Sequence, residues 1–152
     1  MADEIQLSNG LHHVAVNVSD MEKSIKFYRD VLGLRLMFGP QPVSGPGFER
    51  TSRVPRANID FTMLEAGNGS TRVELIKFHN PKGKPNDRKM FDGGAAHIAF
   101  RVKDIGKMVT KLKKNGVEFF SQPLKIDGGP LKGGAFVYFS DPDGVVLELF
   151  QD

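Results

Sequence analysis

The sequence predicts an α+β protein made of two tandem copies of one β-α-β-β-β module. The first observation is an internal repeat: "HVAVNVSD", from His13 to Asp20, lies over "HIAFRVKD", from His97 to Asp104. The second is a change of period, because apolar residues alternate before each aspartate and recur at three- and four-residue steps after it. Each copy therefore begins with a strand that leads into a helix.

The first copy continues from its helix into three more strands. The helix has an apolar stripe at Met21, Ile25, Tyr28 and Leu32. Asp20 can cap its first N–H groups, and Gly33 suits the left-handed residue that ends a helix. The stretches "LRLMF", "IDFTMLEA" and "RVELIKF" predict the strands, with a hairpin turn at Gly67–Gly69 between the last two.

The second copy repeats this order. Its helix is marked by Ile105, Val109 and Leu112, with Asp104 as the cap and Gly116 at the end. The stretches "VEFFSQ", "AFVYFSD" and "VVLELFQ" predict three strands, and "DPDG" is the turn between the last two.

These elements predict one domain over residues 1–152. Module 1 covers about residues 8–80 and module 2 about residues 94–152. The segment between them, at about residues 81–93, is rich in Pro, Gly, Lys and Asp and is interpreted as a linker.

Composition narrows the functional classes. The 152-residue chain is 39% hydrophobic, and no apolar run approaches the roughly 20 residues of a membrane-spanning helix. The absence of cysteine excludes disulfides and thiolate chemistry, and the short acidic start does not resemble a signal peptide, so we expect a cytoplasmic protein. The net charge is +3; the basic segment Lys77–Lys89 is interpreted as a solvated loop, with a phosphate-binding patch as the alternative. Neither a nucleic acid nor a membrane is expected as a partner.

Two residue types recur at matching positions of both copies. Glu74 in "RVELIKF" and Glu148 in "VLELFQD" each stand between apolar neighbours in the last predicted strand. His13 and His97 stand at the head of the first strands. A carboxylate within an apolar strand is costly unless it is paired or bound to a metal. The double recurrence predicts that His13, Glu74, His97 and Glu148 hold one divalent metal ion.

The other two histidines have no counterpart in the repeat. His12 is expected to point to the opposite strand face from His13, and Ala96 stands at its place in the second copy. His79 stands at the end of module 1, just before the linker. Both are interpreted as structural or surface residues.

Three longer stretches carry a family resemblance: "LHHVAVNVSDMEKSIKFYRDVLGL", "AAHIAFRVKDI" and "GGAFVYFSDPDGVVLELFQ". In them the chain resembles the vicinal oxygen chelate superfamily over nearly its whole length. That superfamily includes glyoxalase I, methylmalonyl-CoA epimerase, extradiol dioxygenases, fosfomycin-resistance enzymes and bleomycin-resistance proteins. The resemblance implies paired βαβββ modules whose curled mixed sheets form a metal-bearing cavity. The ligand positions of the family fall on His13, Glu74, His97 and Glu148.

The implied ligand set is closest to that of glyoxalase I (lactoylglutathione lyase). Four protein ligands suit one Zn²⁺, Ni²⁺ or Co²⁺ ion, with Fe or Mn as alternatives, better than they suit oxygen activation. The resemblance implies a metal-dependent lyase or isomerase that abstracts a proton next to a carbonyl and forms a metal-stabilised enediolate. Glu148 is the expected base and Glu74 the alternative. An epimerase-like isomerase, an extradiol-type dioxygenase, a thiol transferase and a drug-binding resistance protein stay open as other functions.

The predicted strands also offer substrate contacts. Asn17 shares a strand face with His13, and Arg101 shares one with His97. Glyoxalase I usually has an arginine at the position of Asn17, where it holds a glutathione carboxylate. Arg101 is placed either to anchor an anionic substrate or to reach solvent. We therefore expect a small anionic substrate.

The Gly- and Pro-rich segment Gly39–Asn58 is longer than an ordinary connection between strands. It is expected to be a lid or binding loop in which Phe48, Arg50 and Arg53 contact substrate, or else to be disordered. One of the two alternating sets in "IDFTML" is expected to line the cavity. A homodimer is expected because curled sheets leave edges that a partner covers.

Overall fold

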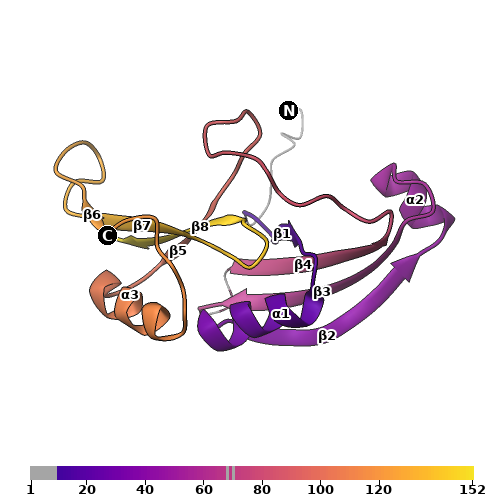
Figure 1. Cartoon of the computed structure of the whole chain (residues 1–152), viewed down its shortest axis with the longest axis horizontal. Helices are drawn as coiled ribbons and strands as arrows, with labels where there is room; N and C mark the ends of the chain where they lie inside the picture. The colour runs from indigo at the N-terminus through magenta and orange to yellow at the C-terminus, as the bar shows by residue number, and fades with distance from the viewer. Residues whose placement is uncertain (1–9, 68, 70) are drawn as a thin grey trace, which may run out of the picture. The chain divides into compact units, whose positions relative to one another are not determined.

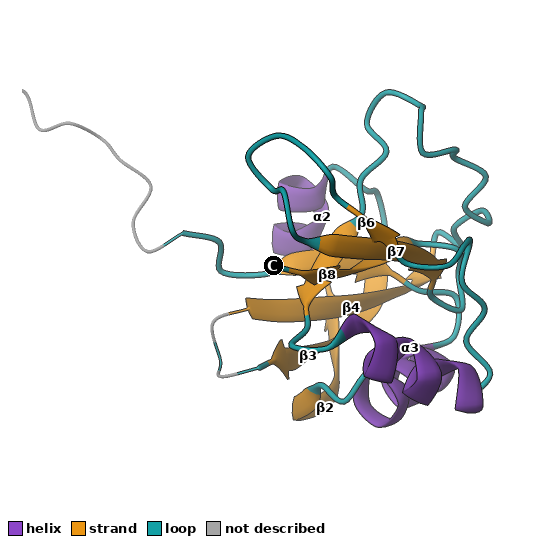
Figure 2. Ribbon diagram, turned by 90° about the vertical axis from the view of Figure 1, so that its left-hand side faces the viewer, coloured by secondary structure: helices purple, strands orange, loops and turns teal. Residues whose placement is uncertain are grey.

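The computed structural model describes residues 10–67, 69 and 71–152. The chain forms two compact units, Met1–Gly83 and Lys84–Asp152, and each has one four-stranded mixed sheet (Figure 1). Figure 2 shows the helices, strands and loops in different colours. The predicted α+β class with βαβββ modules is confirmed. Residues 8 and 9 at the expected start of module 1, and Asn68 in the predicted turn, lie outside the described residues.

The first unit has its strands in the order β1-β4-β3-β2. Strand β1 runs parallel to β4, and the other neighbours are antiparallel. Its elements are β1 (Val14–Asn17), α1 (Met21–Lys26), a π-helical turn η1 (Phe27–Val31), β2 (Arg35–Ser44), α2 (Pro46–Ser52), β3 (Asn58–Ala66) and β4 (Thr71–Asn80).

The second unit repeats this topology in the order β5-β8-β7-β6, with β5 parallel to β8. Its elements are β5 (Ile98–Arg101), α3 (Ile105–Lys114), β6 (Leu124–Lys125), β7 (Ala135–Ser140) and β8 (Val146–Gln151). The return of the last strand beside the first therefore places their residues next to each other in both units.

Alternation along the strands gives each sheet one buried face. In β7, Val137 and Phe139 are buried while Phe136 and Tyr138 are only partly covered. The helix α3 contacts β8 and buries the apolar residues Ile105, Val109 and Leu112. In the first unit, α1 contacts β4 and buries Met21, Ser24 and Ile25. The opposite face carries polar and apolar side chains together, since Glu74 lies beside Met63 in the first unit and Glu148 beside Tyr138 in the second.

The cap of α1 gives a first prediction. The Asp20 carboxylate accepts a hydrogen bond from the Lys23 backbone N–H at 3.1 Å. Asp20→Ala leaves this N–H without its acceptor, so we expect the free energy of unfolding to fall by about 1 kcal/mol in urea titrations followed by circular dichroism. Glu22→Ala removes a carboxylate from the same helical turn without removing the cap. Equal losses in the two variants would contradict the capping role.

The expectation that Gly39–Asn58 is a loop or disordered is wrong. Residues up to Ser44 continue β2, and Pro46–Ser52 form α2. β2 is an edge strand, where proline can be placed without losing a ladder hydrogen bond, and two register shifts between Leu36 and Gln41 absorb its irregular stretch. Pro46 stands in the first turn of α2, where its missing N–H has no helical partner to lose.

The strand predicted for "VEFFSQ" is also misplaced. In this stretch only Phe119 makes a bridge, to Phe139, and β6 follows at Leu124–Lys125. Val117 is buried while Phe120 is exposed, so of these residues Val117 contributes to the core through its side chain and without a backbone ladder. No helix in the described ranges is long and apolar enough to span a bilayer.

Candidate metal centre

In the first unit, the structure brings His13 and Glu74 together. His13 Nε2 lies 3.4 Å from Glu74 Oε2. His13 immediately precedes β1, and the parallel register of β1 and β4 sets Ala15 beside Glu74. Val73 and Leu75 are buried on one face of β4, so Glu74 projects from the opposite face, and the short distance to Glu74 places the His13 ring on that face too.

The second unit contains the equivalent pair. His97 Nε2 lies 2.9 Å from Glu148 Oε2, and the parallel register sets Ala99 beside Glu148. The Glu148 side chain is 9% exposed, compared with 17% for Glu74. The two pairs thus arise from the same register in both units, and the second carboxylate is the better shielded from water.

The separation of the two atoms in each pair suits a shared metal ion. Two ligand atoms that are each about 2.1 Å from a Zn²⁺ ion lie about 3.0–3.4 Å apart when the ligand–metal–ligand angle is between the square-planar and the tetrahedral value. The N···O separations of 3.4 Å and 2.9 Å lie within or just below this range, and the donors are an imidazole nitrogen and a carboxylate oxygen. Among the described residues, no group of three or more His, Asp or Glu side chains is positioned to hold a metal. The atoms of each pair are therefore suitable metal ligands, and the structure contains them as two separate His–Glu pairs.

Tyr138 lies beside the second pair, and the sequence alone did not indicate it. It lies in register with Glu148 on β7, and its ring meets the His97 ring edge-on with centroids 5.4 Å apart. Burial, and then the negative charge of Glu148, raise the pKa of Tyr138, so its hydroxyl keeps its proton and can donate a hydrogen bond. The alternation in "AFVYFSD" shows which residues share its face, but the sequence does not show its register with Glu148.

The register of β3 settles which of its residues share the face of Glu74. Met63 is paired with Glu74, and Phe61 with Ile76 one step further along β4. Of the two sets in "IDFTML", Ile59, Phe61 and Met63 therefore lie on that face by strand alternation. Thr62 and Leu64 are completely buried on the other face.

The candidate substrate residues lie in three places. Asn17 is exposed at the end of β1. Arg101 is exposed at the end of β5, where its Nε is 2.8 Å from Asp152 Oδ2. Phe48 and Arg50 lie on α2, and Arg53 follows it with a left-handed backbone.

Helix α2 is at the far end of its own sheet from the first pair. It leads into Asn58, and five strand residues from there to Met63 span about 17 Å. The structure therefore does not bring Phe48, Arg50 and Arg53 to the His13–Glu74 pair, and Figure 1 shows α2 at the end of the sheet beyond β2 and β3.

The prediction that His12 points away from His13 is wrong. β1 begins only at Val14, so strand alternation does not apply to His12, and His12 Nδ1 lies 2.8 Å from His13 Nδ1. His79, at the end of β4, forms an ion pair with Asp60 at 2.8 Å.

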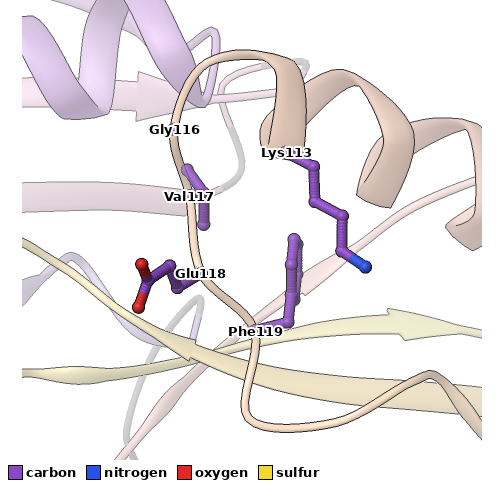
Figure 3. Close-up of a pocket in the computed structure, with 5 residues that line it drawn as sticks. All are labelled: Lys113, Gly116, Val117, Glu118 and Phe119. Atoms are coloured by element: carbon purple, nitrogen blue, oxygen red, sulfur yellow. The ribbon is translucent and has the colours of Figure 1, made fainter.

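A hollow of about 510 Å³ lies where α3 ends, lined by Lys113, Gly116, Val117, Glu118 and Phe119 (Figure 3). None of the predicted site residues lines it.

The sequence and the fold of the chain are similar to those of known proteins. The family model of the Glyoxalase/Bleomycin resistance protein/Dioxygenase superfamily matches residues 10–149. Methylmalonyl-CoA epimerase from mitochondria of Mus musculus is 32% identical over 146 residues, covering 93% of this chain and 72% of that protein. Lactoylglutathione lyase of Haemophilus influenzae is 29% identical over 142 residues, covering 92% and 90%.

A glyoxalase family protein from Bacillus cereus has the same fold in its crystal structure. It matches with a TM-score of 0.82 at 24% identity, covering 99% of this chain and 97% of that one. The family match begins before β1 and runs into β8, so it includes all four residues of the two pairs. The resemblance is therefore confirmed, and the chain belongs to the glyoxalase/bleomycin resistance protein/dioxygenase superfamily.

Proposed function

We propose that this protein is a metal-dependent lyase or isomerase of the glyoxalase type. In this proposal His13, Glu74, His97 and Glu148 hold one divalent metal ion, with Zn²⁺, Ni²⁺ or Co²⁺ preferred, and the substrate is a small anionic carbonyl compound. The observation that carries the proposal is the duplicated His–Glu pair, whose N···O separations of 3.4 Å and 2.9 Å suit neighbouring ligands of one ion.

The bound ion would supply a Lewis acid that polarises a carbonyl and lowers the cost of removing a neighbouring proton. Glu148 is the proposed base, because its carboxylate is the better shielded of the two and lies in register with the Tyr138 side chain. Glu74 is the alternative base.

Tyr138 supports this role without taking the proton itself. Its raised pKa keeps its hydroxyl protonated, so it can donate a hydrogen bond to a substrate oxygen or to Glu148. Asn17 and Arg101 remain proposed substrate contacts. Each shares a strand face with one ligand histidine, and Arg101 would have to exchange Asp152 for an anionic substrate group.

The known relatives support both a lyase and an epimerase reaction. A lactoylglutathione lyase and a methylmalonyl-CoA epimerase match the chain at similar identity. The asparagine at position 17, where glyoxalase I usually has arginine, favours a substrate other than a glutathione adduct. We also propose a homodimer, because β2 and β6 are open edge strands in their sheets.

Solvent deuterium exchange tests the reaction class directly. Metal-stripped protein is reloaded separately with Zn²⁺, Ni²⁺, Co²⁺, Mn²⁺ or Fe²⁺ and mixed with 2-oxoaldehyde–thiol adducts or 2-substituted acyl-CoA esters in D₂O. Proton NMR should show exchange at the carbon next to the carbonyl for one substrate class, and only after reloading. If no substrate exchanges with any metal, the lyase or isomerase proposal is wrong. Cleavage of catechols by the Fe²⁺ form would favour the dioxygenase instead.

A further inference from the structure

The first pair has neighbours that the second pair lacks. His12 Nδ1 lies 2.8 Å from His13 Nδ1, and His12 Nε2 lies 2.9 Å from Arg72 Nη1. His13 Nε2 in turn faces Glu74 Oε2. Four side chains therefore form a continuous series of polar contacts, from Arg72 through His12 and His13 to Glu74.

The chemistry of arginine gives this series a direction. A guanidinium only donates hydrogen bonds, so His12 Nε2 must accept one from Arg72. In the neutral His12 ring the hydrogen is then on Nδ1, and this N–H donates to His13 Nδ1. The hydrogen of His13 is consequently on Nε2, the atom that faces Glu74.

This arrangement opposes metal binding at His13 Nε2. A ligand nitrogen must present its lone pair, so the hydrogen has to leave Nε2 and His13 has to carry it on Nδ1. His12 Nδ1 would then have to accept, and its own hydrogen would be on Nε2. Two N–H groups, from His12 and Arg72, would face each other across the present 2.9 Å contact. The contact between His12 and Arg72 must therefore break before His13 can take the form that binds a metal.

The second unit provides an internal comparison. In the repeat, Ala96 stands at the place of His12, and Val146, two residues before Glu148, stands at the place of Arg72. His97 thus has neither neighbour, and its Nδ1 is not held by a second imidazole of the repeat. These two positions distinguish the surroundings of the two pairs, together with Tyr138, which lies beside Glu148 where Met63 lies beside Glu74.

We propose that Arg72, acting through His12, is a positioning residue that holds His13 with its hydrogen on Nε2 and thereby lowers the affinity of the site for its metal. The inference rests on the proposed metal site. Arg72 Nε–H is buried without a hydrogen-bond partner among the described residues. An unsatisfied buried donor is costly, so Arg72 is not fully satisfied where it contacts His12.

The position of the ring hydrogens can be measured without metal. Long-range ¹H–¹⁵N NMR of metal-stripped protein should show the hydrogen of His13 on Nε2 and that of His12 on Nδ1. In Arg72→Val, which copies the residue found at Val146, His13 should shift toward the Nδ1–H form. If His13 already has its hydrogen on Nδ1 in the unaltered protein, or if Arg72→Val leaves both rings unchanged, the inference is wrong.

Metal affinity is the second readout, measured by competition with a chelating dye. Arg72→Val should bind Zn²⁺ about tenfold more tightly, the scale of outer-shell effects on metal sites. The matched control is Arg35→Met, which removes another cation from the same sheet: Arg35 pairs with Glu65, and Glu65 is in register with Arg72. An equal gain in the control would mean that charge alone acts, and would overturn the inference. If no form binds metal, the proposed function and the effect on affinity both fail, while the NMR result still decides whether Arg72 sets the positions of the ring hydrogens.

Discussion

Replacing His97 by alanine is expected to remove all of the bound metal, not half of it. The unaltered protein should contain one divalent ion per chain, because the proposal joins both His–Glu pairs at one ion. Two ligands alone, a histidine and a glutamate, leave a divalent ion mostly in water, so the loss of either pair removes tight binding. His13→Ala should therefore have the same effect as His97→Ala, although the two residues belong to different units.

The measurement is elemental analysis of protein dialysed against a weak chelator, with Zn²⁺ and Ni²⁺ tested separately. His79→Ala is the matched control, because His79 is 40% exposed and pairs with a carboxylate just as His97 does, at 41%. The control should keep its metal. If His13→Ala and His97→Ala each keep half of a two-ion content, the pairs are separate sites; if both keep full content, neither histidine is a ligand.

The pairs could be predicted from the sequence because the repeat encodes them twice. The first and last strands of each copy each carry one unusual polar residue, and a βαβββ chain returns its last strand beside its first. What the sequence predicts is residue identity, and what the fold adds is register: Ala15 beside Glu74, and Ala99 beside Glu148. The distances of 3.4 Å and 2.9 Å follow from that register.

Other features depend on neighbours that are distant in sequence. Gly39, Pro40 and Pro42 predict a loop by local propensity, yet a sheet edge accepts them because one side of an edge strand needs no hydrogen bonds. In the sequence, nothing distinguishes Tyr138 from the other aromatic residues of its strand. Only the pairing of β7 with β8 places it beside Glu148. Position in the sheet thus overrides the local preference of the Gly- and Pro-rich segment, and it makes Tyr138 a candidate functional residue.

His12 shows the limit of alternation as a guide. The pattern of "HHVAVNV" predicts opposite faces for His12 and His13, but the strand begins only at Val14. Before that residue the backbone is free to bring the two rings together, with their centroids 5.1 Å apart. A one-residue error in a strand boundary thus changes His12 from a surface residue into a neighbour of a candidate ligand.

Glu148→Gln is expected to lower the rate of deuterium exchange by about 10²–10⁴-fold, the usual contribution of a general base. The amide keeps an oxygen in place of the carboxylate but cannot take a proton from carbon. Glu74→Gln makes the same chemical change in the first pair, where the side chain is 17% exposed instead of 9%. Since Glu148 is the proposed base, Glu74→Gln should lower the rate much less.

Metal content must be measured on the same samples, because a variant that loses its ion would lose exchange for another reason. Rates are therefore compared per bound ion, at saturating metal. A larger loss in Glu74→Gln than in Glu148→Gln would assign the base to the first pair. Equal, large losses would mean that either carboxylate can act, as expected of a nearly symmetric centre. Full exchange in both variants would exclude both carboxylates as the base and leave the pairs with metal binding alone.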